Sequence, residues 1–315
     1  MNVAEMVKNV KAECHPVTNI DGIIRRWLDR GQKVVASKHR FSWLRQYKWT
    51  LATVASQEFY ALSPLVDTSK LIIIYNPTDQ TFISGMTEME FRRYEPGPST
   101  GSPYLYRLVG FSPVLTQPTT ASVLDLVSTS ASDTAVIVTV QGLDSAGILF
   151  TEEVTTNGLT VVSTSTSVSK VLSLSKATTS IGTISVSAGA TVLVKIAPRD
   201  RSVQHPIIAL FNIPDAVDSL CYDFTMKLPT LSDDHDISLI PEQYHDVPEL
   251  YAKWQCFKHL NNPTMTQAVA MEFAARVNDM IADDYQPTGV FAMNSFRPNQ
   301  LPLAQLPGMY PRDDT

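Results

Sequence analysis

Cysteine is scarce in this sequence, and long hydrophobic runs are absent. Cys14, Cys221 and Cys256 are widely spaced, and an odd number without a CxxC pair fits no closed set of disulfides. The densest apolar run, residues 71–75, is far too short to cross a membrane. The N-terminal residues also lack the apolar stretch of a signal peptide. We therefore expect a soluble intracellular protein with reduced thiols and no membrane partner.

Signals for catalysis are equally sparse. The 13 glycines include no phosphate-binding loop, no GxSxG sequence is present, and the six histidines show no HExxH or HxH spacing. The adjacent pairs Glu152-Glu153 and Asp283-Asp284 point apart on a strand or a helix, so neither suits acid–base chemistry. We expect no catalytic residue, metal or cofactor, and hence no enzyme. A divalent-metal site at residues 233–236 (Asp-Asp-His-Asp) is the alternative, although aspartate also favours turns and caps there.

The charge balance is acidic, with a net charge of -6 and a pI of about 5.5. A general binder of nucleic acid needs a basic surface that neutralises phosphates, so we do not expect one here. The acidic balance does not exclude a protein that DNA must pass without sticking. The hydrophobic content of 44% is ordinary for a chain that buries a core, and 315 residues suffice for one large or two ordinary domains.

The strongest helical pattern lies in residues 239–284. Apolar residues spaced by three and four predict two antiparallel helices joined at Asn261-Asn262-Pro263. They are Val247, Leu250, Tyr251, Trp254 and Phe257 in the first helix and Val269, Phe273, Val277, Met280 and Ile281 in the second. Asp246 with Glu249, and Thr264 with Gln267, fit capping boxes at the two starts. One hairpin cannot bury both apolar stripes, so further helices are required.

Residues 1–46 are predicted to supply those helices. Asn2 and Glu5 fit the cap of a short helix that Pro16 ends. A longer helix follows, with an apolar side between Ile20 and Val35. Its other side is basic and contains Arg25, Arg26, Arg30, Lys33, Lys38 and Arg40. This face is either solvated charge or a contact with an acidic partner surface, and the residues we expect at such a contact are Arg25, Arg26, Arg30 and Lys33.

Six aromatic residues of the helical part are expected in its core. They are Trp27, Trp43, Tyr244, Trp254, Phe257 and Phe273. For the three tryptophans the alternative is a platform on which a ligand stacks.

Between the helical ends the hydrophobic period changes to that of strands. Residues 48–55 and 58–62 predict a hairpin turning at Ser56-Gln57, and residues 207–211 and 219–228 predict another turning near Pro214-Asp215. Residues 71–75 and 81–83 predict a strand pair, residues 87–96 a short helix and residues 104–109 a further strand. We therefore expect small antiparallel sheets beside the helices.

Residues 113–198 have a different composition. About a third of them are Ser or Thr, Phe150 is the only aromatic residue, and Trp, Cys and Met are missing. Short β-branched runs alternate with turn signals such as Asn157-Gly158, which predicts a β-sandwich of six or seven strands. A disordered Ser/Thr-rich linker is the alternative. Because prolines stand at both joints, we expect the sandwich to be a domain inserted into a loop of its host.

Residues 286–315 combine five prolines with isolated large apolar residues. Such a segment cannot form a compact element, but it suits an extended arm laid on another subunit, because a disordered tail usually has fewer large apolar residues. The residues expected to bind the partner are Phe291, Met293, Phe296, Leu301, Leu303, Leu306, Met309 and Tyr310.

Several passages, in their order, resemble those of tailed-bacteriophage head–tail adaptor (connector) proteins. They are WLRQYKWTLATVASQEFYAL, LIIIYNPTDQTFISGMTEMEFRRYEP, STGSPYLYRL and LIPEQYHDVPELYAKWQCFKHLNNP. In that family a Leu/Ile-x-Pro-Glu-x-Tyr-His passage opens the late helix, and its positions here are Ile240, Pro241, Glu242, Gln243, Tyr244 and His245. The resemblance covers residues 1–112 and 199–285.

The insertion is similar to Ig-like modules of phage structural proteins. The passage QGLDSAGILFTEEVTTNG carries this resemblance. The residues at matching places are Gly142, Asp144, Gly147, Glu152 and Gly158.

Together these features predict an α+β fold. Residues 1–112 and 199–285 would form a helical-bundle adaptor core with small antiparallel β-sheets, residues 113–198 an inserted all-β Ig-like sandwich, and residues 286–315 the arm. The resemblance implies a virion protein whose copies form a dodecameric ring below the portal, extend the DNA channel and dock tail proteins (nozzle, stopper or tail tube). DNA would pass without specific binding. The alternative is a phage adhesion or decoration protein whose Ig-like module binds carbohydrate or the capsid surface.

Overall fold

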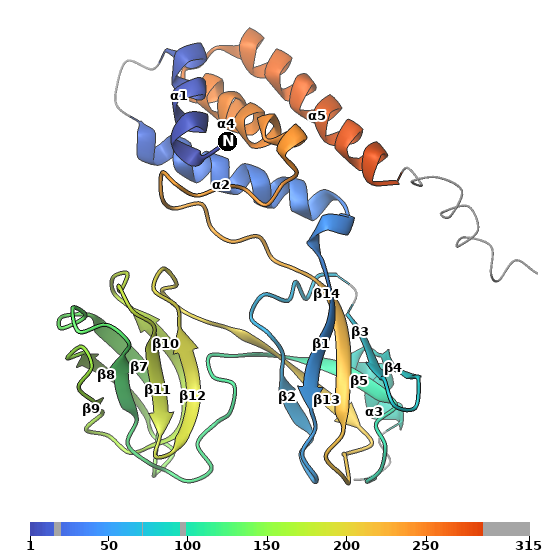
Figure 1. Cartoon of the computed structure of the whole chain (residues 1–315), viewed down its shortest axis with the longest axis vertical. Coiled ribbons are helices and arrows are strands. Elements are labelled where there is room, and N and C mark those ends of the chain that lie inside the picture. The colour runs from blue at the N-terminus through green and yellow to red at the C-terminus, as the bar shows by residue number, and fades with distance from the viewer. Residues whose placement is uncertain (16–19, 71, 95–98, 286–315) are drawn as a thin grey trace, which may run out of the picture. The chain divides into compact units, whose positions relative to one another are not determined.

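The structure is a computed structural model that describes residues 1–15, 20–70, 72–94 and 99–285. It has an α+β fold and divides into two compact units. The first, called here the helical unit, comprises residues 1–43 and the chain from residue 228 onward, and the second, the strand unit, comprises residues 44–227. Figure 1 shows α1, α2, α4 and α5 gathered in the helical unit.

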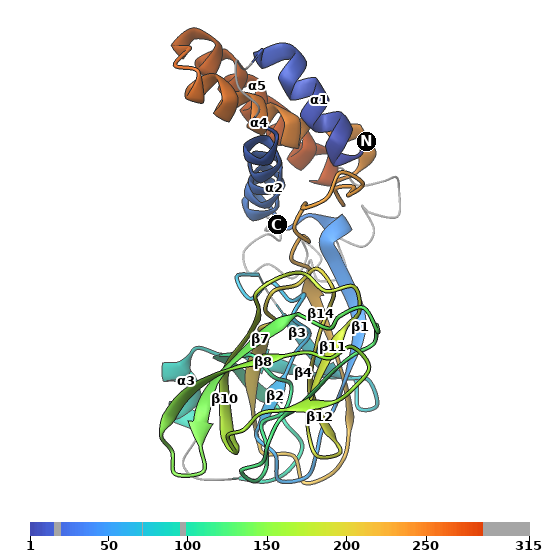
Figure 2. The same ribbon diagram turned by 90° about the vertical axis from the view of Figure 1, so that its left-hand side faces the viewer.

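Helix α4 is the central element of the helical unit, because it packs against α1, α2 and α5 (Figures 1 and 2). The four helices are α1 Val3–Cys14, α2 Asp21–Lys38, α4 Asp246–His259 and α5 Pro263–Tyr285. Val247, Ala252 and Cys256 of α4 are fully buried, which a helix reaches only when neighbours cover several of its faces. The predicted late helix pair is confirmed, and α1 and α2 provide the additional apolar surface that it required.

The predicted cap of α1 is confirmed, whereas the predicted caps of α4 and α5 are wrong. Glu5 N donates to Asn2 Oδ1 at 2.9 Å, and Asn2 N donates to Glu5 Oε2 at 2.9 Å. A 3₁₀ turn, Glu242–Tyr244, leads directly into α4, so no side-chain cap forms there. At α5, Asn262 accepts a hydrogen bond from Met265 N at 3.2 Å, which places the cap before Pro263 rather than at Thr264.

The cysteines are buried free thiols. Cys14 is the last residue of α1, and His15 beyond it has a φ of 46°, the left-handed conformation that commonly closes a helix. Pro16, predicted to end this helix, lies outside the described residues. Burial and a hydrogen bond with Cys256 raise the pKa of Cys14 to about 12, so this thiol is a poor nucleophile at neutral pH.

The strand unit contains one seven-stranded mixed sheet, not the small antiparallel sheets that were predicted. Its order is β1-β14-β3-β4-β5-β13-β2, and only the β4–β5 pair is parallel. The strands are β1 Arg45–Ala52, β2 Phe59–Ala61, β3 Ile73–Asn76, β4 Thr81–Gly85, β5 Leu105–Ser112, β13 His205–Phe211 and β14 Ser219–Thr225. The predicted pairing of β3 with β4 is confirmed.

The seven-stranded sheet curls into a half-barrel, because the connection between its two edge strands is too short to span a flat sheet. Strands β1 and β2 occupy its two edges, six strand spacings or about 29 Å apart if the sheet were flat. Only seven residue steps separate Ala52 from Phe59, which span at most about 25 Å. The connection passes beside the β13–β14 connection, since Ser56 N donates to Pro214 O at 2.8 Å.

Both predicted hairpins in this sheet are therefore wrong, although the chain does turn at Ser56. Ser56 has a φ of 64°, as a tight reversal requires. Strand β1 nevertheless pairs with β14, and β2 pairs with β13. The inner face buries residues of six strands, and Ile74, Tyr106 and Tyr222 are among them. The closing of this core therefore decides which strands pair.

Helix α3 (Glu88–Tyr94) covers part of the outer face of the curled sheet. Phe91 is buried against Leu105, Ala209 and Phe211 of β5 and β13. Thr87 caps the helix, because Glu90 N donates to Thr87 Oγ1 at 3.4 Å and Thr87 N donates to Glu90 Oε2 at 3.1 Å. This short helix was predicted, and it is confirmed.

Two further sheets enclose a separate core between residues 114 and 203. Their orders are β10-β7-β8 and β12-β11-β6-β9, and all their pairs are antiparallel. The strands are β6 Asp125–Ser128, β7 Ile137–Asp144, β8 Leu149–Thr155, β9 Val162–Ser163, β10 Val168–Lys176, β11 Ile184–Ala188 and β12 Thr191–Ile196. Val138, Leu174, Val186 and Val194 are among the inward residues of this sandwich. The alternative of a disordered linker is therefore wrong.

Candidate interaction surfaces

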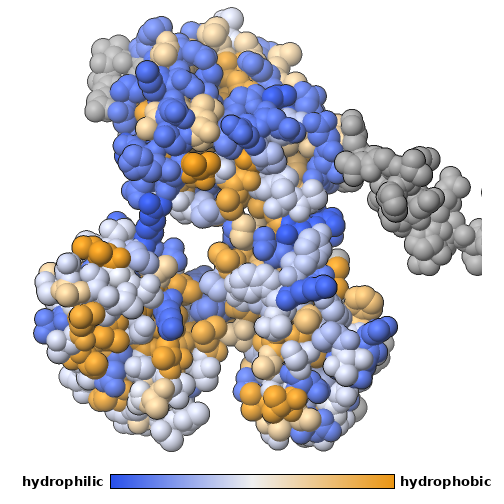
Figure 3. Space-filling model, in the orientation of Figure 1, coloured by the Kyte–Doolittle hydropathy of each residue, from blue (hydrophilic) through white to orange (hydrophobic). Residues whose placement is uncertain are grey.

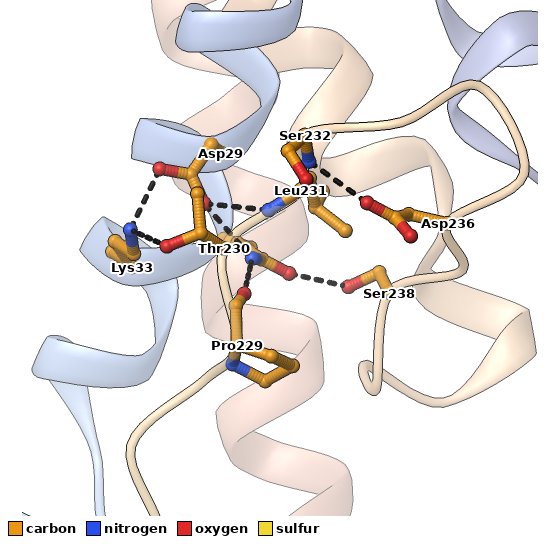
Figure 4. A network of polar contacts seen from close by, with 9 residues as sticks. Asp29, Lys33, Pro229, Thr230, Leu231, Ser232, Asp236 and Ser238 are labelled. Carbon is orange, nitrogen blue, oxygen red and sulfur yellow. Dashed lines mark hydrogen bonds and ion pairs between the residues drawn. The ribbon is translucent and has the colours of Figure 1, made fainter. Parts of the chain in front are cut away.

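A segment of the helical unit, residues 229–238, lies along the polar side of α2, and we call it the strap. Gln32 is fully buried, donates from Nε2 to Pro229 O at 2.7 Å and accepts from Ser238 Oγ at 3.0 Å. Asp29 accepts from Leu231 N at 3.0 Å. Figure 4 shows these contacts from both ends of the strap converging on one stretch of α2. The strap thus covers part of the face that the sequence presents as basic.

Two of the four basic residues predicted to bind a partner already have partners in the chain. Lys33 Nζ donates to Asp29 Oδ2 at 2.7 Å and to Thr230 Oγ1 at 3.2 Å (Figure 4). Arg25 forms an ion pair with Asp234 of the strap at 2.5 Å. Arg26 and Arg30 are exposed; Arg26 Nε makes a local bond to Gly22 O at 3.3 Å. Of these four residues, Arg26 and Arg30 are therefore the two whose charge is available to another molecule.

The Asp-Asp-His-Asp run, residues 233–236, belongs to the strap and binds chain groups. Asp236 accepts from Ser232 N and Asp233 N, each at 2.8 Å. The carbonyls of Asp234 and Asp236 accept from Ala4 N and Val3 N at the start of α1. Within the described residues, no group of three or more His, Cys, Asp or Glu side chains is arranged to hold a metal ion. The run ties α1 and α2 together.

The passage Ile240–His245, which carries the resemblance, forms a junction in which Ile240, Tyr244 and His245 are buried. Tyr244 donates from its hydroxyl to the carboxylate of Asp283 near the end of α5. His245 Nε2 donates to Ile240 O at 2.8 Å, and the amine of Met1 donates to His245 Nδ1 at 3.1 Å. Burial has the largest effect on the pKa of Tyr244 and raises it, and the hydrogen bond and negative charge of Asp283 raise it further. These contacts hold the start of α1, the start of α4 and the end of α5 at one place.

The six aromatic residues expected in the core divide into two groups. Tyr244, Phe257 and Phe273 are buried. Trp27, Trp43 and Trp254 are half-buried at the margin of the helical unit. Trp254 stacks on Phe273 with ring centroids 6.2 Å apart and meets Tyr251 edge-on at 5.5 Å. Its orientation is thus fixed while one side remains accessible.

The accessible side of Trp254 borders a shallow, mostly apolar hollow of about 520 Å³ at the α4–α5 turn. We call it the turn hollow. Its lining is Trp254, Lys258, Asn261, Asn262, Pro263, Thr266, Gln267 and Ala270. A second hollow of about 360 Å³ adjoins it and includes Met271, which is 67% exposed. The sequence indicated this site only through the alternative that Trp254 is a platform for a stacking ligand; the hollow beside it was not predicted.

The outer face of the curled sheet carries an exposed apolar row. Tyr75 and Phe82 are cross-strand partners whose ring centroids lie 6.0 Å apart, and Phe82 is 72% exposed. Ile73 lies on the same face of β3 and is also exposed. Figure 3 shows apolar areas on both parts of the strand unit, whereas the visible side of the helical unit is mostly hydrophilic.

The sandwich contains a polar cluster that the sequence did not reveal. The buried Asp133 accepts from Ile181 N and Gly182 N at 2.8 Å and from Ser128 Oγ at 2.5 Å. Lys176, also buried, donates to Ser180 Oγ at 2.7 Å and to two backbone carbonyls. Phe150, the only aromatic residue of the insertion, packs partly buried against the sandwich core, so it is no stacking platform for sugars.

The eight arm residues expected to bind a partner, Phe291 to Tyr310, lie outside the described residues. Among the described helices, none is both long and apolar enough to cross a membrane. A comparison with protein-family models matched none of them, and a comparison with curated protein sequences also found no match.

Proposed function

We propose that this protein is a head–tail adaptor of a tailed bacteriophage. In this proposal its copies form a dodecameric ring below the portal, extend the DNA channel and dock the nozzle, stopper or tail-tube proteins. The observation that carries the proposal is the role of the Ile240–His245 passage. The residues that resemble the adaptor family are the ones that join α1, α4 and α5 through Tyr244 and His245.

In the finer assignment, residues 1–112 and 199–285 form the adaptor and residues 113–198 form an Ig-like insertion. The half-barrel sheet and the sandwich have separate hydrophobic cores, which supports treating them as distinct modules. The exposed apolar residues on the outer face of the curled sheet, such as Ile73 and Phe82, are suited to contact with protein partners.

The role is structural, without a catalytic residue, metal or cofactor, and its place is the virion. The net charge of -6 supports a channel that DNA crosses without specific binding, because an acidic wall repels phosphates. Arg26 and Arg30 would meet an acidic surface of the portal or of a neighbouring copy.

The test is the mass of the purified protein, alone and mixed with portal, measured by mass photometry. We expect a monomer alone and a ring-sized complex with portal. A variant that lacks residues 286–315 should keep its circular dichroism spectrum but fail to dock, because the arm supplies apolar contacts to the partner. Indifference of the full chain to portal would refute the adaptor assignment, and normal docking by the truncated chain would refute the role of the arm.

The second candidate is a decoration protein that binds the capsid surface through the sandwich. Ile148 and Leu149, which are 64% and 59% exposed, favour a protein surface as its target. Carbohydrate is disfavoured because Phe150 packs on the core. Binding of the full chain to portal-free capsids, abolished by Ile148→Glu with Leu149→Glu, would favour this candidate over the adaptor.

A further inference from the structure

The turn hollow is a preorganised feature on the surface of the helical unit. The ring of Trp254 is held by Phe273 and Tyr251, so it loses little conformational freedom when a ligand stacks on it. Asn261 has a φ of 54°, and Asn262 N donates to Phe257 O at 3.0 Å, which fixes the turn itself. A rigid aromatic platform beside a formed turn is suited to binding.

The wall of this hollow combines apolar and polar groups in a way that fits an extended peptide. Trp254, Pro263 and Ala270 offer apolar contact. The side chains of Asn261, Asn262 and Gln267 carry amides, which donate to and accept from peptide groups. Aromatic grooves with such donors are the usual docking sites of proline-containing extended segments, since proline limits the conformational entropy that binding costs.

The sequence of this chain contains a matching ligand. Residues 301–311 include three dipeptides of a large apolar residue followed by proline, Leu301-Pro302, Leu306-Pro307 and Tyr310-Pro311. The residue before a proline favours extended backbone, which suits a groove. Asp313 and Asp314 follow, and their charge complements Lys258, an exposed residue on the wall of the hollow.

We infer that the turn hollow binds residues 301–314 of a neighbouring copy of this chain. The hollow lies at the start of α5, and the arm begins after its other end, about 33 Å away for 22 residue steps. A segment that leaves one end of a helix and docks at the other end of the same helix in the next copy makes a head-to-tail contact. Such contacts close into rings when the rotation permits.

This inference rests on the proposed ring and names the contact that would link its copies. One hollow of about 520 Å³ accepts only a few side chains, so a single contact is weak. Copies held side by side on a portal would raise the effective concentration of the arm and make the contact persistent. The protein is therefore expected to be monomeric at low concentration and linked once assembled.

The experiment is chemical crosslinking between two differently tagged full-length chains at high micromolar concentration, without portal. One chain carries Gln267→Cys and the other Leu306→Cys, and the three native thiols are buried. We expect a crosslinked heterodimer. The matched control replaces Gln267→Cys by Asn278→Cys, an exposed position farther along α5. Equal yields from residues 267 and 278 would overturn the inference.

Variants of the two sides give an independent check. Trp254→Ala should weaken the contact roughly thirtyfold, as loss of a central aromatic anchor does. Trp254 also packs on Phe273, so its removal could act through folding. The decisive variants therefore change charge, and Lys258→Glu should reduce crosslinking roughly fivefold. Adding Asp313→Lys and Asp314→Lys to the partner chain should restore it. Loss without rescue would overturn the assignment of this segment to this hollow.

The mass of the crosslinked product shows whether the arm binds the hollow of a neighbouring copy or the hollow of its own chain. A single chain with both Gln267→Cys and Leu306→Cys should crosslink to a second copy, and a product of monomer mass only would overturn the neighbour assignment. Because this experiment contains no portal, a failure to crosslink would leave the result of the portal-docking test unaffected. Conversely, a chain that crosslinks to its copies but ignores portal would retain this contact and refute the adaptor.

Discussion

The hydroxyl of Tyr244 donates a hydrogen bond to the carboxylate of Asp283, and Arg276 lies over the same tyrosine ring at 4.9 Å. Asp284, the next residue, points elsewhere: it accepts from Ser42 N at 2.9 Å and pairs with His39. Two acidic residues at a helix C-terminus are unfavourable next to the negative end of the helix dipole. Their separate partners offset this cost and fasten the end of α5 on two sides.

The first prediction concerns this bond. Tyr244→Phe removes the hydroxyl but keeps the ring under Arg276, so the free energy of unfolding should fall by about 1 kcal/mol. Urea denaturation followed by far-UV circular dichroism measures it. Asn278→Ala, at an exposed position of the same helix, is the control and should change the value by less than about 0.5 kcal/mol. A Tyr244→Phe value within the range of that control would mean that the bond does not stabilise α5.

Two glycines of α2 lead to predictions of opposite sign. A Cβ on Gly31 would lie 2.9 Å from the Cβ of Tyr251 in α4, too close to tolerate without moving the helices apart. Gly31→Ala should therefore destabilise the protein by about 1–3 kcal/mol, despite the better helix propensity of alanine. A Cβ on Gly22 meets nothing within 4 Å, so Gly22→Ala should be neutral or stabilising by up to about 1 kcal/mol. Thermal unfolding of both variants tests the pair, and a Gly31→Ala protein as stable as Gly22→Ala would contradict the close packing of α2 on α4.

The helices could be predicted from sequence because their signals are local. The spacing of Val247, Leu250 and Tyr251 defines a buried face within two turns, and the Asn2–Glu5 cap spans four residues. The strand pairs were mispredicted where pairing depends on the whole sheet. Ser56 is a genuine turn, but β1 and β2 stand at opposite edges because the sheet curls around its core. The four-residue strand β6 likewise depends on distant segments, because its partners β9 and β11 are far from it in sequence.

The candidate surfaces were predictable only in part. The charge of the α2 face could be read directly, but the ion pair of Arg25 with Asp234 joins residues far apart in the chain. Sequence spacing therefore could not tell which cations remain available. Trp254 was assigned to the core by its helical position, and its half-buried side became evident only with the turn at Asn261-Asn262 in place.

Charge reversal should distinguish the exposed cations of α2 from those that form ion pairs within the chain. Arg26→Glu with Arg30→Glu should leave unfolding nearly unchanged and abolish association with portal, because these exposed residues are free to meet an acidic partner. Arg25→Glu with Lys33→Glu should instead lower the free energy of unfolding by about 1–2 kcal/mol, because it places negative charge beside Asp234 and Asp29. Mass photometry with portal and urea denaturation measure the two effects. Unchanged portal binding by the first variant would exclude Arg26 and Arg30 from the interface.

The last prediction concerns pH and the sandwich. Burial acts to raise the pKa of Asp133, but hydrogen bonds from Ser128, Ile181 and Gly182, together with the charge of Lys176, outweigh it and hold the pKa below its ordinary range. The folded pKa thus lies below the unfolded value of about 3.9. This carboxylate therefore stabilises the fold above about pH 4, and its contribution disappears as the pH falls through the folded pKa.

Asp133→Asn should cost about 3 kcal/mol at neutral pH, since it removes a charged acceptor of three hydrogen bonds. The difference between the native protein and this variant should shrink as the pH falls below about 4, where the native carboxyl is itself neutralised. Urea denaturation between about pH 2 and pH 7 measures both. Glu153→Gln, an exposed change on the same sandwich, is the control. A difference that stays constant over this range would show that Asp133 acts through its shape rather than its charge.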